Sequence, residues 1–376
     1  MKVLLVDQFG KTAGRDTLAL AELINQNQEI DMTVYLSDTT EIPSDQHYTV
    51  AIKMGFHGAY EGNAFNKASN YLKALKELRK YIEENHFDVV HLQWFSLPWI
   101  EWIYVSMLKK LCKIVITVHD VIPFDKRPLE MQSLDKIYSR ANALVLHTET
   151  NKDLFKRKYK ASTPITVVSQ AFCLKSDYHQ IDSCEAKQHF GIHQNAVVFL
   201  YYGTIRPSKG LDILIKSISD AHRQNENVYL LAAGAFHNVN EKEYYTLVKE
   251  YLNETFSSVH FEFVPHEEEK WYFSAADVLC LPYLEITQSG VAQRGLMYDL
   301  PIIATNVGEM KEVCRDAENG ILISSGEQEE LTRAIIKMSE DENFRKSAKL
   351  QSKNLGEKEF SLVTKSNQII ELYMNV

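Results

Sequence analysis

Residues 281–313, LPYLEITQSGVAQRGLMYDLPIIATNVGEMKEV, decide the predicted fold of this chain. The segment reads as the end of a buried strand, a polar loop, a short helix opened by Ser289 and Gly290, and a second apolar strand at 302–305. A β-loop-α-β unit of this kind presents the first helix amides, and the positive end of the helix dipole, at the carboxyl edge of a parallel sheet. The segment therefore predicts an anion-binding site at that edge.

Three polar residues surround the predicted helix start. Glu285 lies in the loop, Ser289 is the expected N-cap, and Gln293 follows Ser289 by four residues on the same face of the helix. A carboxylate can hold two sugar hydroxyls, the helix amides at Gly290 and Val291 can hold a phosphate, and a side-chain amide one turn later can reach a ribose diol. Together these residues predict a site for a nucleotide sugar.

The same segment resembles the glycosyl transferases group 1 family, which are retaining enzymes with the GT-B fold. Their signature has two glutamates with seven residues between them, a small-residue turn within that interval and a following G-x-P-[VI]-[IV]-A-[ST] strand. Glu285 matches the first glutamate, 289–291 match the turn and 301–305 match the strand, but Gln293 replaces the second glutamate. An amide keeps the hydrogen bonding and loses the charge, so the resemblance implies weaker or differently tuned ribose binding.

Length and composition predict a soluble enzyme of two domains. The 376 residues exceed one ordinary core. The net charge of −9 argues against a nucleic-acid-binding protein, because such proteins carry a basic excess. The five cysteines contain no C-x-x-C pair, which favours a reducing cytoplasm over a disulfide framework or a zinc site. No apolar run reaches the roughly 20 residues that a membrane-spanning helix needs.

The amino-terminal segment predicts a strand, a glycine-containing loop and a helix. Residues 2–7 read as a buried strand, 8–14 as a loop with Gly10 and Gly14, and 15–26 as a helix. The loop is not a Walker-type phosphate loop, because the chain lacks the first glycine of that motif. The resemblance implies that both glycines border a cleft between the domains. The alternative is that Gly10 and Gly14 only allow the chain to turn and have no further role.

A histidine after the predicted strand 113–118 is the other expected active-site residue. An imidazole at the carboxyl end of a parallel strand points into the crevice where ligands of open α/β sheets bind. The resemblance implies that His119 lies near a hydroxyl and the reacting carbon of the donor sugar. Asp120 either joins it or caps the next segment. His91, in FDVVHLQW, either faces the same cleft or is a buried structural histidine.

The second domain is predicted to open with a strand at 196–202 and the loop GTIRPSKG. In that loop Arg206 can clamp diphosphate oxygens in a fork, Lys209 supplies a point charge, and the glycines allow the backbone to approach. The spacing is similar to the family's G-x-x-x-x-x-K-G pattern, although many members have arginine where this chain has Thr204. The alternative to diphosphate binding is that Arg206 and Lys209 are simply two solvated cations on a surface loop.

A predicted helix at 96–111 carries Trp99 and Trp102 and ends in a pair of lysines. Two interpretations stay open for it. Aromatic residues with basic ends suit a peripheral contact with the inner face of the cytoplasmic membrane, which the basic segment KDLFKRKYK at 152–160 would strengthen. A helix packed on the sheet, with a solvated basic end, is the alternative.

The expected architecture is α/β, with two Rossmann-like β/α/β domains that face each other across a cleft in the GT-B arrangement. An acceptor-binding domain is expected at 1–172, a nucleotide-sugar-binding domain at 173–355, and a C-terminal helix that packs back on the N-terminal domain at 356–376. This division follows the alternation of strand and helix patterns and the polar segment near residue 173.

The resemblance implies a retaining hexosyltransferase that moves a hexose from a nucleotide-diphosphate sugar to a glycan or lipid-linked acceptor in bacterial surface polysaccharide synthesis. The chain has no D-x-D pair to chelate a divalent ion, so neither a metal nor a cofactor is expected. A nucleotide-sugar epimerase or phosphorylase is one alternative, and the chain nominates no extra acid-base carboxylates for an epimerase. A non-catalytic partner subunit is the other: Gln293 and Thr204 favour it, whereas Glu285, His119 and Lys209 oppose it.

Overall fold

The computed structural model describes residues 1–376 except for 41, 43–46, 124–128, 170–179 and 287–288. The chain divides into two compact units, each built around its own parallel sheet. Unit 1 comprises Met1–Cys173 and Ser361–Val376, and unit 2 comprises Leu174–Phe360. The predicted α/β class with two Rossmann-like domains is confirmed, as is the return of the C-terminal helix to the N-terminal domain.

Unit 1 contains seven parallel strands in its described residues, in the order β3-β2-β1-β4-β5-β6-β7. They are β1 (Lys2–Asp7), β2 (Asp31–Ser37), β3 (Ala51–Gly55), β4 (Val89–Leu92), β5 (Lys113–Thr117), β6 (Ala143–Leu146) and β7 (Ile165–Val167). The central strands are apolar and buried, which is typical of a parallel sheet covered on both faces. The edge strand β3 is half-exposed and contains a lysine, so its pattern did not predict a strand.

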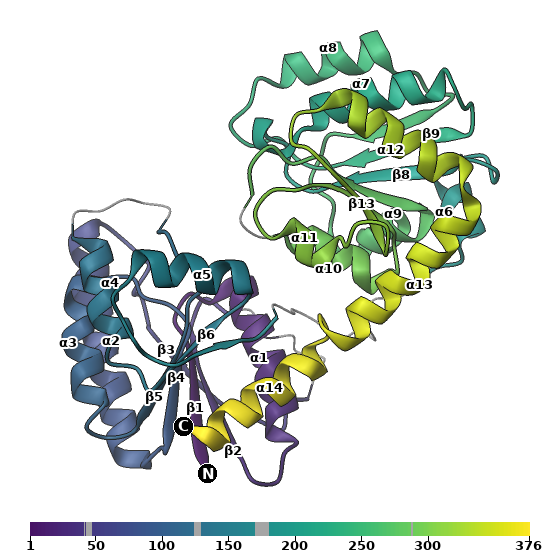
Figure 1. Ribbon diagram of the computed structural model, residues 1–376. Helices are drawn as coiled ribbons and strands as arrows, with labels where there is room; N and C mark the ends of the chain where they lie inside the picture. Colours follow the sequence, from purple (N-terminus) through teal and green to yellow (C-terminus); the bar gives the residue numbers. More distant parts are fainter. Residues whose placement is uncertain (41, 43–46, 124–128, 170–179, 287–288) are drawn as a thin grey trace. The chain divides into compact units, whose positions relative to one another are not determined.

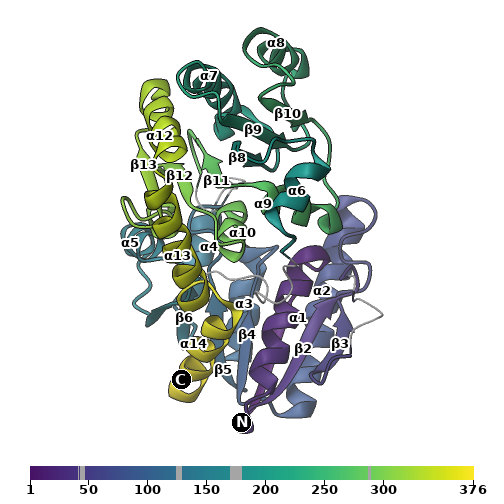
Figure 2. The ribbon, with the colours of Figure 1, turned by 90° about the vertical axis from the view of Figure 1, so that its right-hand side faces the viewer.

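Helices cover both faces of the unit 1 sheet (Figure 1). They are α1 (Lys11–Asn25), α2 (Ala64–Asn85), α3 (Pro98–Leu108), α4 (Glu130–Tyr138), α5 (Glu149–Lys158) and α14 (Leu362–Asn375). Helix α14 lies along α1 on one face in both views (Figures 1 and 2), and α2, α3 and α4 lie on the other. The C-terminal helix therefore completes the covering of a sheet whose strands come from the first half of the chain.

Unit 2 contains six parallel strands in its described residues, in the order β10-β9-β8-β11-β12-β13. They are β8 (Val197–Tyr202), β9 (Val228–Ala233), β10 (Ser257–His260), β11 (Val278–Leu281), β12 (Ile302–Thr305) and β13 (Gly320–Ile323). The helices are α6 (Ser183–His189), α7 (Leu211–His222), α8 (Glu241–Tyr251), α9 (Glu269–Ala275), α10 (Gly290–Met297), α11 (Met310–Val313), α12 (Gln328–Glu340) and α13 (Glu342–Lys358). On one face α7 packs against α12, and on the other α10 packs against α13 (Figure 1).

Helix α1 begins earlier than predicted, at Lys11, so Gly14 lies in its first turn and not in a loop. Gly10 precedes the helix with φ of 67°, a left-handed conformation that favours glycine. A Cβ atom on Gly14 would lie 2.4 Å from Thr40 Oγ1, so the absence of a side chain lets the helix approach the residues after β2. Packing therefore accounts for Gly14, and a role for either glycine at a cleft stays a prediction.

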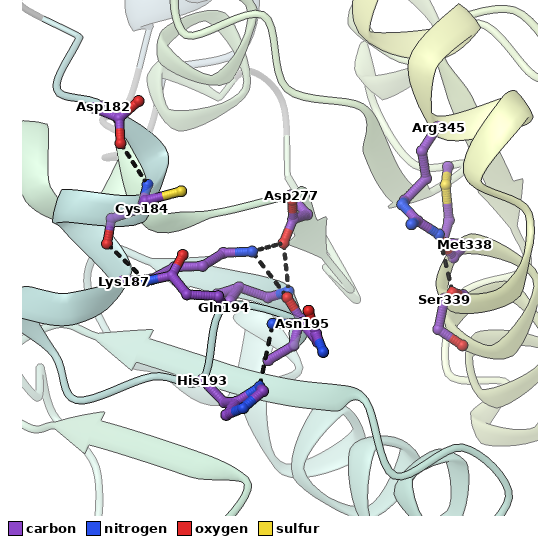
Figure 3. Close-up of polar contacts among 12 residues, drawn as sticks. Asp182, Cys184, Lys187, His193, Gln194, Asn195, Asp277, Met338, Ser339 and Arg345 are labelled. Atoms are coloured by element: carbon purple, nitrogen blue, oxygen red, sulfur yellow. Dashed lines mark hydrogen bonds and ion pairs between the residues drawn. The ribbon is translucent and has the colours of Figure 1, made fainter.

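Helix α6 lies in a polar segment of the sequence for which no helix was predicted. Its side chain Lys187 is buried, and Lys187 Nζ lies 2.9 Å from Asp277 Oδ2 and 2.8 Å from the carbonyl oxygen of Ala196 (Figure 3). The same carboxylate oxygen of Asp277 accepts from the backbone N–H of Val198 at 2.9 Å. This buried ion pair joins α6 to the first residues of β8 and β11, and the polar composition of the segment concealed it.

Candidate functional site

Two loops of unit 2, at 203–210 and 282–286, lie against each other at the carboxyl edge of its sheet. The backbone N–H of Leu284 donates to the carbonyl oxygen of Ser208 at 2.8 Å. Gly210 has φ of 66°, and a Cβ atom there would lie 2.0 Å from the carbonyl oxygen of Pro282. Only glycine permits this close approach of the loops. The approach brings the predicted diphosphate-binding loop next to the stretch that contains Glu285.

Lys209 is half-buried at this contact and lies over an aromatic ring. Its Nζ is 3.7 Å from the ring centroid of Tyr283, a buried residue that the sequence reasoning did not single out. Burial, assisted by the neighbouring Arg206 guanidinium, lowers the pKa of Lys209 to about 8. Arg206 itself is exposed. The loop thus holds two cations near each other, which suits a ligand with more than one negative charge.

The predicted helix start is confirmed at α10. Ser289 is the N-cap, and its Oγ accepts from the backbone N–H of Ala292 at 3.3 Å. The hydroxyl of Tyr283 lies 3.2 Å from the same Oγ. A Cβ atom on Gly203 would lie 3.3 Å from Val291 Cγ2, so the first residue of the cationic loop also packs against the helix start. The first amides of a helix have no acceptor within the helix and remain suited to an anion.

Glu285 and Gln293 differ sharply in environment. Glu285 is exposed, and its backbone N–H lies 3.5 Å from the carbonyl oxygen of Ser208. It lies on the same loop as Tyr283, whose ring contacts Lys209. Gln293 is only 8% exposed, and its Oε1 has no hydrogen-bond partner among the described residues. A buried carbonyl oxygen without a partner is unfavourable. A hydroxyl donor from a ligand would satisfy it.

Beside Gln293, a polar network joins α10 to α9 and β8. Glu269 accepts from Arg294 at 2.8 Å and from the hydroxyl of Tyr202 at 3.0 Å. His266 Nδ1 lies 3.1 Å from the other oxygen of Glu269, and this hydrogen bond raises the pKa of His266. The network holds α10 in place through Arg294, which lies in that helix. Its members come from three separate segments, so sequence reasoning did not bring them together.

In unit 1, His119 follows β5 and is held by three neighbours. Its ring stacks on Trp94 with centroids 3.9 Å apart and an interplanar angle of 9°. Its Nε2 lies 3.0 Å from Gln93 Oε1, and its Nδ1 lies 3.4 Å from His147 Nε2. These residues follow β4, β5 and β6, so adjacent parallel strands deliver them to one edge of the sheet.

Burial favours the neutral forms of both His119 and His147. His147 Nδ1 donates to the carbonyl oxygen of Val168 at 3.0 Å, because a carbonyl can only accept. Burial lowers the pKa of His147 to about 4 and that of His119 well below its usual range, and Lys365 on α14 acts in the same direction. When His119 Nε2 donates to Gln93, the two nitrogens that face each other both carry lone pairs. That contact becomes a hydrogen bond if the amide of Gln93 turns over or the pair binds one proton.

His91 does not join this edge as a cleft residue. It is fully buried within β4, where its Nδ1 lies 2.7 Å from the hydroxyl of Tyr373 and its Nε2 lies 2.8 Å from Thr117 Oγ1. His91 is therefore a buried structural histidine, which was the alternative interpretation, and its hydrogen-bond partners are side chains. Asp120 is half-buried, and burial raises its pKa.

The two tryptophans of α3 have different surroundings. The ring of Trp102 is covered by one cation of α4 and one of the turn that follows it, with Lys136 Nζ 4.9 Å and Arg140 Cζ 5.0 Å from its centroid. Trp99 is 42% exposed and Ile103 is exposed on the same helix. Trp102 thus packs within the unit, and Trp99 is the tryptophan that is open to a surface. No helix in the described part of the chain combines the length and apolarity needed to cross a membrane.

Within the described residues, no group of three or more His, Cys, Asp or Glu side chains is arranged to hold a metal ion. The described polar groups of the unit 2 site include cations, helix amides, the Gln293 amide and the carboxylate of Glu285. Of the predicted site residues, Arg206, Lys209, Glu285, Ser289, Gly290, Val291 and Gln293 all belong to this one edge of unit 2.

Two family models match most of the chain. Residues 182–355 match the model described as Glycosyl transferases group 1, and residues 17–172 match the model described as Glycosyltransferase Family 4. The chain belongs to the glycosyl transferases group 1 family. It is therefore a glycosyltransferase, and the family resemblance of the stretch around Glu285 is confirmed.

Individual relatives are distant in sequence. The chain is 25% identical over 370 residues to the uncharacterized glycosyltransferase MJ1178 of Methanocaldococcus jannaschii, and the match covers 96% of this chain and 93% of that protein. It is 25% identical over 276 residues to an uncharacterized 41.2 kDa protein in the cps region of Klebsiella pneumoniae, with 70% and 71% covered.

Among solved structures, Anabaena Alr3699/HepE in complex with UDP is similar over 100% of both chains, with a TM-score of 0.78 and 17% identity. At this identity the likeness concerns the fold alone, and that fold is GT-B.

Proposed function

We propose that this glycosyltransferase moves a hexose, with retention of anomeric configuration, from a nucleotide-diphosphate sugar to a glycan or lipid-linked acceptor in bacterial surface polysaccharide synthesis. The contact between the two loops of unit 2 carries the donor part of the proposal. It sets Lys209, the start of α10 and Glu285 at one edge of the sheet. A diphosphate requires cations and amides, and a sugar requires a carboxylate beside them.

In this proposal the protein acts by electrostatics and orientation. Arg206, Lys209 and the amides of Gly290 and Val291 stabilise the charge that develops on the departing diphosphate. As the bond between the anomeric carbon and the diphosphate breaks, a diphosphate oxygen takes the proton of the attacking hydroxyl on the same face of the sugar. Glu285 is proposed to orient the sugar by accepting hydrogen bonds from its hydroxyls, and His119 is proposed as the second catalytic residue.

Gln293 is proposed to bind the ribose, because its buried Oε1 is an acceptor that a ribose hydroxyl would satisfy. Complexes of Anabaena HepE with UDP and with UDP-glucose make uridine nucleotides the first donors to test. The relative from the cps region of Klebsiella pneumoniae supports a surface polysaccharide as the product. No metal ion is proposed, because the two cations and the helix start can neutralise the diphosphate.

Thermal stabilisation by nucleotide sugars tests the donor site. A ligand that binds only the native state raises its apparent stability. We expect a rise in Tm with one class among UDP-, GDP-, dTDP- and ADP-sugars, unchanged by EDTA. A rise that EDTA removes would contradict metal independence. No rise with any donor would favour the non-catalytic partner subunit, for which the Gln293 substitution is the main argument.

Two substitutions test the site residues in the donor-dependent reaction. Lys209→Ala and Glu285→Ala should each lower kcat/KM by about 100-fold or more, the scale of losing one preorganised electrostatic contact. Lys242→Ala and Glu241→Ala on the exposed surface of α8 are matched controls that should change little. Circular dichroism would verify that the variants fold. Turnover close to that of the natural chain in either site variant would reject the assignment.

We also propose a peripheral contact with the inner face of the cytoplasmic membrane through α3. Trp99 and Ile103 are exposed on that helix, and Lys109 and Lys110 follow it, which suits an interface with anionic lipids. The double variant Trp99→Ser, Ile103→Ser should lose flotation with anionic liposomes, whereas Phe65→Ser on α2 should not. Equal flotation of both variants would exclude α3 as the contact.

A further inference from the structure

A row of aromatic rings at the carboxyl edge of the unit 1 sheet has no role in the function described so far. Phe9 follows β1 and is 51% exposed. Its ring centroid lies 5.0 Å from that of Trp94 and 6.2 Å from that of Tyr60. Trp94 in turn stacks on His119. We call Phe9, Tyr60 and Trp94 the aromatic platform.

The platform is held in place by buried groups. Asp7, the last residue of β1, is buried, and its Oδ1 accepts from the backbone N–H of Phe9 at 2.9 Å. Its Oδ2 also accepts from Thr17 Oγ1 of α1 at 2.6 Å. One buried carboxylate therefore ties the loop that carries Phe9 to α1, so a ligand would meet an ordered surface.

A single exposed phenylalanine is common on protein surfaces and needs no explanation. Phe9 differs because it adjoins two other rings at the sheet edge where ligands of open α/β domains bind. Polar groups lie beside the rings: the hydroxyl of Tyr60 is 3.5 Å from Ser96 Oγ, and both residues are half-buried. Aromatic faces next to hydroxyl groups match a ligand that has an apolar face and a polar rim.

A pyranose ring has this chemistry. Its axial C–H bonds form an apolar face that can stack on an aromatic ring, whose face is electron-rich, and its hydroxyls project around the rim. A lipid alcohol would use the aromatic faces, but its alkyl chain would present no rim of hydroxyls to the polar groups beside the platform.

We propose that the aromatic platform binds a pyranose of the acceptor, so that the acceptor is a saccharide. This inference rests on the proposed function and specifies its acceptor class.

Saturation-transfer NMR on the full chain tests this proposal with the methyl glycosides of glucose, galactose, mannose and N-acetylglucosamine as probes. We expect at least one glycoside to bind, with the strongest saturation on the protons of one ring face. Phe9→Ala should weaken that binding about three- to tenfold, the scale of one aromatic contact, and Phe9→Tyr should retain it. Phe65→Ala is the matched control, because Phe65 is 81% exposed on α2. It should bind as the natural chain does.

Failure of this proposal differs from failure of the proposed function. If no glycoside binds, or if Phe9→Ala binds as tightly as the natural chain, while nucleotide sugars still raise the Tm, the platform proposal is wrong and the donor site stands. If glycosides bind through Phe9 but no nucleotide sugar raises the Tm, the platform stands as a saccharide site and the transferase proposal fails.

Discussion

Lys209 experiences two opposing influences on its charge. Burial and Arg206 favour the neutral amine and lower its pKa to about 8, whereas a bound diphosphate favours the ammonium. Contact with the ring of Tyr283 also favours the cation. The charge that the proposed reaction needs is therefore retained only below about pH 8 in the ligand-free enzyme.

The pH dependence of kcat/KM for the donor follows from this pKa. The ammonium form binds the diphosphate, so kcat/KM should fall as the pH rises through about 8. Arg206→Gln removes a nearby positive charge, raises the pKa of Lys209 and should move the alkaline limb to higher pH, while lowering the plateau. An alkaline limb that stays in place or moves to lower pH in this variant would contradict the coupling.

Gln293 is expected to show opposite effects on stability and on binding. Gln293→Met keeps the length of the side chain and removes the unpaired buried oxygen. The free energy of unfolding of the ligand-free chain should rise by about 1 kcal/mol, the lower end of the cost of an unsatisfied buried group. Affinity for the nucleotide sugar should fall. Urea titration and calorimetric binding measure the two effects, and a loss of stability with unchanged affinity would contradict the assignment.

At the scale of elements, α14 supplies partners to the histidines of unit 1. Tyr373 contacts His91, and Lys365 contributes to the lowered pKa of His91, His119 and His147. Lys365 is itself affected, since burial lowers its pKa to about 8. The helix thus does more than cover apolar surface, because it joins the core of a sheet made by the first half of the chain.

Removal of the Tyr373 hydroxyl tests this connection. Tyr373→Phe leaves the buried Nδ1 of His91 without a partner, so the free energy of unfolding should fall by about 1–3 kcal/mol. Tyr245→Phe on α8 is the control, because Tyr245 is exposed. Both are measured by urea denaturation at pH 7. If the two variants lose equal stability, the hydrogen bond has no measurable role.

At the scale of the whole molecule, each unit has a hydrophobic core of its own. The core of unit 2 joins both faces of its sheet through residues such as Phe199, Leu230 and Ile303. A core of unit 1 lies between its strands and the helices α2 to α5, with Leu78, Val105 and Phe155 among its members. Units with separate cores can unfold at different temperatures.

Scanning calorimetry should therefore resolve two transitions. The donor nucleotide sugar should raise only the transition of unit 2, and Lys209→Ala should remove that rise. Tyr373→Phe should lower only the other transition. If calorimetry shows a single transition, and both the nucleotide sugar and Tyr373→Phe shift it, the two units unfold as one.

Sequence patterns alone predicted the features that depend on neighbours along the chain. Ser289 as the N-cap, the start of α10 and the strand after Pro301 follow from local turn chemistry and apolar runs. The same local reasoning failed where local signals are weak. The half-exposed strand β3 resembles a loop, and Gly14 resembles a turn residue although it lies inside α1.

The sequence by itself determined the alternation of strands and helices and the identity of the residues at the strand ends, because these are set by composition and short-range spacing, and its resemblance to the signature around Glu285 indicated the family. Only the tertiary structure decided which of them meet. Lys209 lies over Tyr283, and the hydroxyl of Tyr373 reaches His91, because strand order and helix packing bring distant segments together. Burial lowers the pKa of His119 and leaves Gln293 Oε1 without a hydrogen-bond partner among the described residues. It exists only after packing has excluded water from both sites.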